Sequence, residues 1–206
     1  MSGIVWISDM LVDSEVALPV TNDLRGSDIF LEGINLLKKG GSVQAGACPK
    51  RIWGSQEEDS IALTSVPDLF CANGQYIVSE KAANILRQFD LGGGALYSVS
   101  EGVYQNDNLT RVPGDFFTWI FGNVKTAFLP DETLAKRPFG VAGTRWNMPF
   151  VVQDDDIAVS KASLDGPDVW IDPALMRAVF LSGQLGQALS DAGLANAFRL
   201  KTCRLI

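Results

Sequence analysis

The sequence predicts an α+β fold, with mixed or antiparallel sheets and a few packed amphipathic helices. Short apolar runs that suit strands recur along the chain, and only a few segments show helical spacing. The order of strand, serine-capped helix and strand occurs twice, around Ser79 and around Ser182. Hydrophobic residues make up 47% of the chain, which is ordinary for a globular protein and argues against disorder over most of its length. At 206 residues the chain can bury a good core, so we expect one domain over residues 1–206.

The N-terminal portion predicts a strand and then a helix. Residues 5–7 are apolar and suit an opening strand. Ser27 is a candidate N-cap, and the helix that follows it would end near Gly40. The inward side chains of this helix are three or four residues apart: Phe30, Ile34 and Leu37. Residues 40–54 are rich in glycine and serine and predict a loop, and residues 61–66 predict a strand.

The middle of the chain predicts a second helix between two strands. Residues 76–78 lead into Ser79, which suits an N-cap. Apolar positions then recur at i, i+3, i+4 and i+7: Ala82, Ile85, Leu86 and Phe89. Three glycines at positions 92–94 end the helix, and residues 95–99 resume an extended pattern. Because these glycines follow a helix and do not open one, they do not form a dinucleotide-binding loop.

An aromatic segment follows at residues 116–121, Phe-Phe-Thr-Trp-Ile-Phe, which is typical of a buried strand. The Gly-Asn pair after it predicts a turn, so an antiparallel hairpin would continue through residues 124–129 and stop at Pro130. A base-stacking surface for nucleic acid is the alternative. The scarcity of basic residues beside the aromatic ones argues against this alternative.

The clearest pattern lies between residues 159 and 206. An apolar run at residues 168–172 precedes Pro173, which suits the first turn of a helix that Asp172 would cap. Trp170, in the same run, is the residue that we expect to anchor the core.

A further strand at residues 179–181 leads into Ser182, the predicted N-cap of the last helix. The apolar side chains of this helix recur at helical spacing: Leu185, Ala188, Leu189 and Ala192. Gly193 supplies its end, and residues 198–206 alternate loosely as a final strand. Two copies of strand, capped helix and strand can arise by chance, so we use the echo only to support the fold class.

The chain resembles an immunity-protein family of bacterial polymorphic toxin systems in four segments that occur in the family's order: VPDLF, YIVSEKAANIL, FFTWIFGNVKTAFLP and LDGPDVWIDPALMRAVFLSGQLGQALSDAGLANAFRLKTCRL. The family was long catalogued as a domain of unknown function and includes a myxobacterial immunity domain. The likeness covers residues 65–206, whereas residues 1–64 match it poorly. The resemblance implies a cytoplasmic protein that binds and blocks a cognate toxin, and it implies no catalytic residues.

Charge limits the classes of partner. The formal net charge of −7 argues against a general nucleic-acid binder, which needs a basic face to meet phosphates. The charge is compatible with a basic toxin, although moderate acidity also serves solubility alone. Clustered carboxylates are the residues that we would test first at an interface with the toxin: Asp154, Asp155 and Asp156, with Glu57, Glu58 and Asp59 next.

The residue types also limit the chemistry. The chain has no histidine, which removes Ser-His-Asp and Cys-His sites. Cys48, Cys71 and Cys203 are far apart and odd in number, which predicts reduced, mostly buried thiols and no zinc site. The three adjacent aspartates could hold Mg²⁺ or Ca²⁺, but they lack the spacing of an EF-hand loop. We expect no catalytic residue, no metal and no cofactor.

The N-terminus lacks the basic region of a signal peptide, and no apolar stretch is long enough to span a bilayer, so we expect no membrane partner. The sequence therefore predicts a non-catalytic immunity protein that neutralises a toxin by direct binding. Two alternatives stay open. One is a carboxylate- or metal-dependent hydrolase that reverses a toxin's modification, and the other is an adaptor protein without a toxin.

Overall fold

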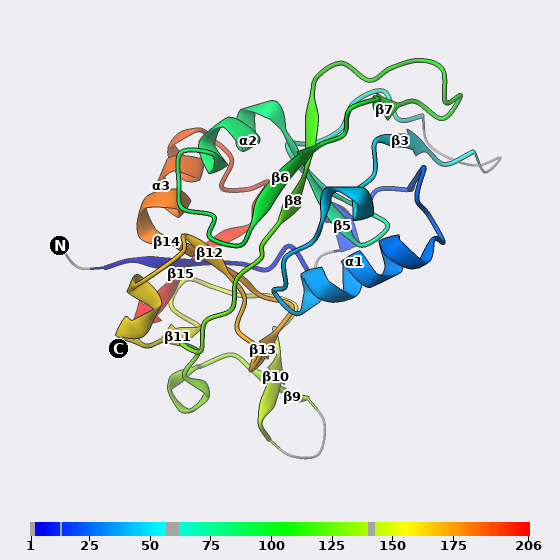
Figure 1. Ribbon diagram of the computed structural model, residues 1–206. Helices are drawn as coiled ribbons and strands as arrows, with labels where there is room; N and C mark the ends of the chain where they lie inside the picture. The colour runs from blue at the N-terminus through cyan, green and yellow to red at the C-terminus, as the bar shows by residue number, and fades with distance from the viewer. Residues whose placement is uncertain (1–2, 13, 57–61, 140–142) are drawn as a thin grey trace.

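The computed structural model describes residues 3–12, 14–56, 62–139 and 143–206. In this part of the chain, three α-helices accompany strands in mixed and antiparallel sheets, which confirms the predicted α+β fold (Figure 1).

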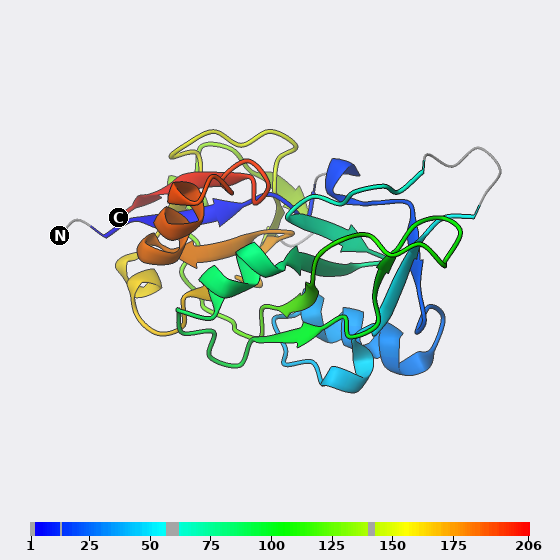
Figure 2. The same ribbon diagram turned by 90° about the horizontal axis from the view of Figure 1, so that it is seen from above.

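The first sheet holds five strands in the order β11-β15-β1-β14-β12. They are β1 (Val5–Ser8), β11 (Ala158–Val159), β12 (Val169–Trp170), β14 (Val179–Ser182) and β15 (Leu200–Leu205). β1 is the middle strand and pairs antiparallel with both β14 and β15. Helix α3 (Gly183–Asp191) connects β14 to β15, so a β-α-β unit encloses a strand from the other end of the chain. Since β1 and β15 are neighbours, the two termini lie close together (Figures 1 and 2).

The second sheet has the order β4-β5-β8-β6. Its strands are β4 (Leu69–Ala72), β5 (Gln75–Ser79), β6 (Ala95–Ser98) and β8 (Phe116–Ile120). Helix α2 (Glu80–Leu86) connects β5 to β6, and β8 lies between these two strands, antiparallel to both. The two sheets therefore share a split β-α-β topology, and the echo seen in the sequence extends to the arrangement of the strands.

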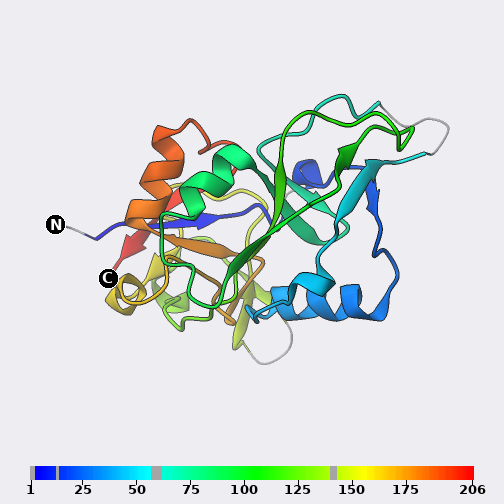
Figure 3. The same cartoon turned by 45° about the horizontal axis from the view of Figure 1, so that its top comes forward.

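Each of these two sheets forms one unit with the helix that connects its strands, α3 in the first unit and α2 in the second. The two helices begin in the same way and lie against each other (Figure 3). The hydroxyl of Ser79 accepts a hydrogen bond from the backbone N–H of Ala82 at 3.3 Å, and that of Ser182 accepts one from Leu185 at 3.3 Å. Both predicted N-caps are confirmed. Gly193, with φ at 74°, follows the end of α3 as predicted, because a left-handed residue closes a helix and glycine adopts it without strain.

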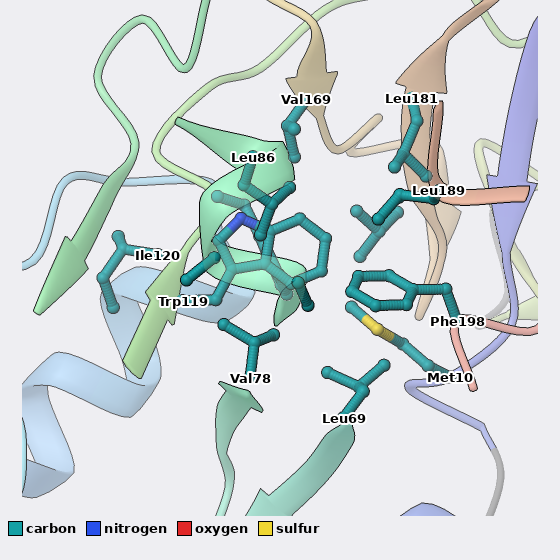
Figure 4. Packing of buried hydrophobic residues seen from close by; sticks show 14 of the residues in the cluster. Met10, Leu69, Val78, Leu86, Trp119, Ile120, Val169, Leu181, Leu189 and Phe198 are labelled. Atoms are coloured by element: carbon teal, nitrogen blue, oxygen red, sulfur yellow. The ribbon is translucent and has the colours of Figure 1, made fainter. Parts of the chain in front are cut away.

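The central core lies between the two units, and Trp119 is in its middle (Figure 4). The ring centroid of Trp119 is 5.6 Å from that of Phe198, which belongs to the other unit. Leu86 from α2 and Leu189 from α3 join the same cluster. A buried aromatic side chain of this size stabilises a core by about 3–5 kcal/mol relative to alanine. The two units are therefore joined by shared apolar packing.

Each of the two sheets has a second apolar cluster on its other face. Behind the first sheet, Trp170 is fully buried and stacks on Phe180, with ring centroids 5.7 Å apart. This confirms the prediction that Trp170 anchors the core. Behind the second sheet, Phe70 and Phe116 contact each other edge to face. A third sheet covers this cluster in the order β2-β3-β7: β2 (Val20–Asn22), β3 (Arg51–Gly54) and β7 (Gly102–Tyr104).

The remaining elements lie around this framework. Helix α1 (Asp28–Lys38) buries the predicted inward stripe of Phe30, Ile34 and Leu37. A fourth sheet has the order β13-β10-β9: β13 (Leu175–Met176), β10 (Arg145–Asn147) and β9 (Arg137–Phe139). Short 3-10 helices occur at Ser14–Val16, Ala45–Ala47, Pro130–Glu132 and Lys161–Leu164.

The hairpin predicted for residues 124–129 is wrong. β8 pairs with β5 and β6, and residues 121–129 belong to no strand of a sheet. A side chain at Gly122 would collide with the backbone of Gly93, so the chain here passes close to the loop that follows α2. The side-chain amide of Asn123 then donates to the carbonyls of Leu91 and Val169, which leads the chain across to the other unit.

The helix predicted to begin at Pro173 is also wrong, because a turn and then β13 follow Asp172. Asp172 is 2% exposed, and its carboxylate accepts backbone N–H groups from Ala127, Phe128 and Ala174 at 2.8, 2.8 and 2.9 Å. Asp172 therefore holds the loop at Ala127 and Phe128 against the turn at Ala174. The local sequence does not indicate this role, because the loop is distant in the chain.

Three N-terminal predictions need correction. Residues 51–54 form β3 within the predicted loop, since they pair with both β2 and β7. Residues 62–66 form no strand, and residue 61 lies outside the described residues. Ser27 does precede α1, but its hydroxyl donates to the carbonyl of Leu24 at 2.8 Å and does not accept from the helix.

Candidate protein-binding face

The structure places Asp154, Asp155 and Asp156 in a tight turn beside β15. Asp154 and Asp155 are exposed and Asp156 is half-buried, as expected for adjacent carboxylates that repel one another. The second predicted acidic cluster, at Glu57, Glu58 and Asp59, lies outside the described residues.

The three carboxylates differ in their contacts. Asp154 accepts the backbone N–H of Thr202 at 2.8 Å, and Asp156 accepts that of Gln153 at 2.8 Å. Asp155 has only a longer contact, 3.4 Å, with the hydroxyl of Thr202. Its backbone is left-handed, with φ at 64°, and its own N–H donates to the carbonyl of Thr202 at 2.9 Å. Two of the aspartates therefore shape the turn, and the carboxylate of Asp155 is the most available to a partner.

Apolar side chains are exposed next to this turn. Phe150 and Val151 are each 69% exposed, and Leu134 is 71% exposed. The backbone N–H of Leu134 donates to the carbonyl of Asp156 at 2.8 Å, which places Leu134 beside the acidic turn. The guanidinium of Arg137 lies 4.1 Å from the ring centroid of Phe150, a cation–π contact that supports the exposed ring.

We define the docking face as this set of neighbouring residues: Leu134, Arg137, Phe150, Val151, Asp154 and Asp155. The sequence indicated its carboxylates but not its apolar members, because residues 146–152 are largely apolar and nothing in the sequence shows which of these side chains are exposed. A possible signal was the position of Phe150 and Val151 between a proline and a polar, acidic turn.

A hollow of about 350 Å³ adjoins the docking face, with Phe150 and Val151 on one side and the start of β15 on the other. Asp9 and Arg199 also line it, and their Oδ1 and Nε atoms are 2.7 Å apart. The side chain of Asp9 is only 6% exposed. Because a charge buried to this extent needs its partner, the ion pair fixes β15 against the segment that follows β1.

The thiols do not add a nucleophile to this surface. Cys48 and Cys203 are buried and Cys71 is half-buried, and all three are free, in line with the predicted reduced thiols. Burial raises the pKa of Cys48 to about 12, and it raises the pKa values of Cys71 and Cys203 as well. All three side chains are therefore protonated near neutral pH, and the thiol is the poorly reactive form.

The described ranges contain neither a cluster of metal-ligating side chains nor a helix that could cross a membrane. No group of three or more Asp, Glu or Cys side chains is arranged there to hold a metal ion. None of the helices in the described part of the chain has both the length and the apolar character needed to cross a bilayer. In comparisons with known proteins, no family model, curated protein or solved structure matches this chain.

Proposed function

We propose that this protein is an immunity protein that binds a cognate bacterial toxin in the cytoplasm and neutralises it by direct, non-catalytic contact. The observation that carries the proposal is the docking face, where three exposed apolar side chains adjoin an acidic turn. Apolar side chains that gather on a surface in this way mark sites of protein association. The sequence resemblance described above supplies the class of partner.

The two parts of the docking face suit different tasks. Phe150 and Val151 can enter an apolar pocket of the toxin, and a few such anchors supply most of the affinity of an interface. Asp154 and Asp155 add negative charge at the edge, where charges steer association and select a basic partner. The net charge of −7 also attracts a basic partner, at longer range.

The test is co-purification. The tagged chain is expressed together with an inactive form of the toxin domain encoded by the neighbouring gene, and the bound fraction is analysed for stoichiometry. We expect a stable complex of defined stoichiometry, and we expect the chain to protect cells against the active toxin. Protection without any complex would contradict direct neutralisation and favour a catalytic route. A chain that neither binds nor protects would leave the adaptor alternative.

A further inference from the structure

The two units agree in more than the order of their strands. In each unit a central strand lies between the two strands that the helix connects and is antiparallel to both: β1 in the first unit and β8 in the second. In each unit a further strand, β12 or β4, pairs antiparallel with the strand before the helix. The elements β4, β5, α2, β6 and β8 therefore correspond to β12, β14, α3, β15 and β1. β11 is an additional edge strand of the first unit.

The register of the pairing is also the same when it is counted from the two capping serines. Ser79 is opposite Phe116, the first residue of β8. Ser182 is opposite Val5, the first residue of β1. A shift by one residue would turn every side chain of a strand to the other face of its sheet. The two sheets therefore place corresponding residues on corresponding faces.

A four-residue motif occupies the same place in both units: Pro-Asp-Leu-Phe at residues 67–70 and Pro-Asp-Val-Trp at residues 167–170. Its aromatic residue is fully buried in both. Its aspartate accepts the same backbone hydrogen bond in both, because the N–H of the capping serine donates to the carbonyl of Asp68 or of Asp168, each time at 2.9 Å. Identical residues thus make identical contacts at corresponding positions.

The helices continue the match. Leu86 in α2 and Leu189 in α3 follow the capping serines at equal distances, and both are fully buried in the core that the units share. Leu91 and Leu194, which come after the helices, are also equally distant from the two serines. Chance similarity accounts for any one of these features, but not for strand order, register and identical residues together.

We infer that the chain is an internal duplication of one β-β-α-β-β unit, and that β1 is the last strand of the first unit, moved to the other side of the chain. In the second unit this strand is β8 and follows β6, whereas β1 precedes β12, β14 and β15. A circular permutation relates the two orders. The geometry allows it, because Val5 is opposite Cys203, so that the start of β1 lies beside the end of β15.

The duplication also shows how the docking face is built. Residues 121–166 connect β8 to the second copy of the Pro-Asp motif, and every residue of the docking face lies between positions 134 and 155. The docking face therefore belongs to the connection and not to the repeated part. Binding residues are often carried on connections that a rigid scaffold positions. The inference of a duplication does not itself depend on the proposed toxin binding.

The test moves β1 to the position that the duplication assigns to it. The permuted chain runs from residue 13 to Ile206, continues through a flexible linker of about four residues, a length typical of hairpin connections, and ends with residues 3–12. The reference is the chain from residue 13 to Ile206 alone. We expect the reference to lose the cooperative urea transition and the permuted chain to regain it, with the near-ultraviolet circular dichroism of the parent. A permuted chain that unfolds like the reference, or a reference that unfolds like the parent, would overturn the inference.

A mirror permutant separates a duplication from the mere closeness of the two ends. It has the same linker between Ile206 and Gly3 and is opened between Asn108 and Leu109, in the loop before β8, where Leu109 is 82% exposed. β8 then begins the chain, and the second unit takes the order that the first unit has in the parent. We expect one cooperative transition, because copies of one unit tolerate either order. A mirror permutant without such a transition would contradict the duplication.

One substitution checks that the moved strand returns to its place. Ile7 is 1% exposed, so Ile7→Val should lower the urea midpoint by the same amount in the parent and in the permuted chain. Ile4→Val, at a position 46% exposed, is the matched control and should leave both midpoints unchanged. A midpoint that falls in the parent alone would show that the moved strand does not pair with β14 and β15, and would also overturn the inference.

Discussion

At the scale of single residues, Asp172 has the largest predicted effect on stability. Its buried carboxylate accepts three backbone N–H groups, and alanine would leave all three without a partner. We expect Asp172→Ala to lower the free energy of unfolding by roughly 3 kcal/mol or more. Asp172→Asn keeps one acceptor oxygen and should lose less. Urea unfolding measures both, with the exposed Asp165→Ala as control, and a loss below about 1 kcal/mol in the alanine variant would refute this role.

The buried thiols predict how stability depends on pH. In the unfolded chain Cys48 titrates near its ordinary pKa of 9.0, whereas in the folded protein burial raises its pKa to about 12. Above pH 9 the unfolded state therefore binds fewer protons, so this contribution is complete below pH 9 and is lost as pH rises towards 12. Cys203 contributes to the pH dependence of stability in the same direction, because burial raises its pKa as well.

We expect the free energy of unfolding to fall by up to about 1.4 kcal/mol per pH unit for each buried thiol in this window. Urea denaturation midpoints between about pH 8 and about pH 10.5 measure the fall. Cys48→Ala should reduce the slope. A flat profile over that window, or an unchanged slope in the alanine variant, would contradict the assigned cause.

At the scale of elements, the aspartates of the acidic turn have different roles: Asp154 and Asp156 stabilise the turn, whereas Asp155 is available to contact a partner. Asp154 and Asp156 hold backbone N–H groups, so reversing the charge of the whole triplet would also disrupt the turn. Asp155→Asn removes one charge and keeps a residue type that tolerates the left-handed backbone. We expect this variant to slow association with a basic toxin by a few fold at low salt, with little change in dissociation.

Stopped-flow or surface-binding kinetics at two ionic strengths check this prediction. The difference between variant and parent should shrink as salt screens the interaction. Asp165→Asn, an exposed aspartate outside the docking face, is the matched control and should associate like the parent. Equal association rates for Asp155→Asn and the parent at low salt would remove Asp155 from the interface.

Elements that depend on neighbouring residues could be predicted from the sequence. Ser79 and Ser182 are N-caps as expected, because a hydroxyl before a helix acts on an N–H three residues away. The prediction of a hairpin after β8 was wrong because the path of the chain there depends on contacts with Gly93 and Val169, which are distant in sequence. Exposure of Phe150 could not be predicted either, since an apolar side chain gives no local sign of the surface that it will meet.

At the scale of the whole molecule, β1 completes the sheet that contains β14 and β15, from the other end of the chain. The sequence suggested residues 65–206 as the part of the chain to compare with a known family, yet the central strand of the sheet in this region is Val5–Ser8. Without β1, the paired edges of β14 and β15 lose their partner and the apolar faces of Val5 and Ile7 are missing. No sequence pattern indicates this pairing, because it joins residues at opposite ends of the chain.

We therefore expect a fragment of residues 65–206 to lack cooperative unfolding, whereas the full chain unfolds in one transition because its units share the core around Trp119. Near-ultraviolet circular dichroism during urea titration distinguishes the two. A chain that starts at residue 3 keeps β1 and serves as control. A cooperative transition in the 65–206 fragment would show that this region folds as a domain of its own.

The central claim is that the docking face binds a toxin, and the most direct measurement is the affinity of a Phe150→Ser, Val151→Ser double variant for the toxin domain. Both side chains are 69% exposed, so their removal should leave folding intact. Loss of apolar anchors should weaken binding by at least about tenfold. Leu109→Ser, at a position 82% exposed and outside the docking face, should bind like the parent. If the double variant binds with parental affinity, the toxin contacts another surface and the docking face is not the site.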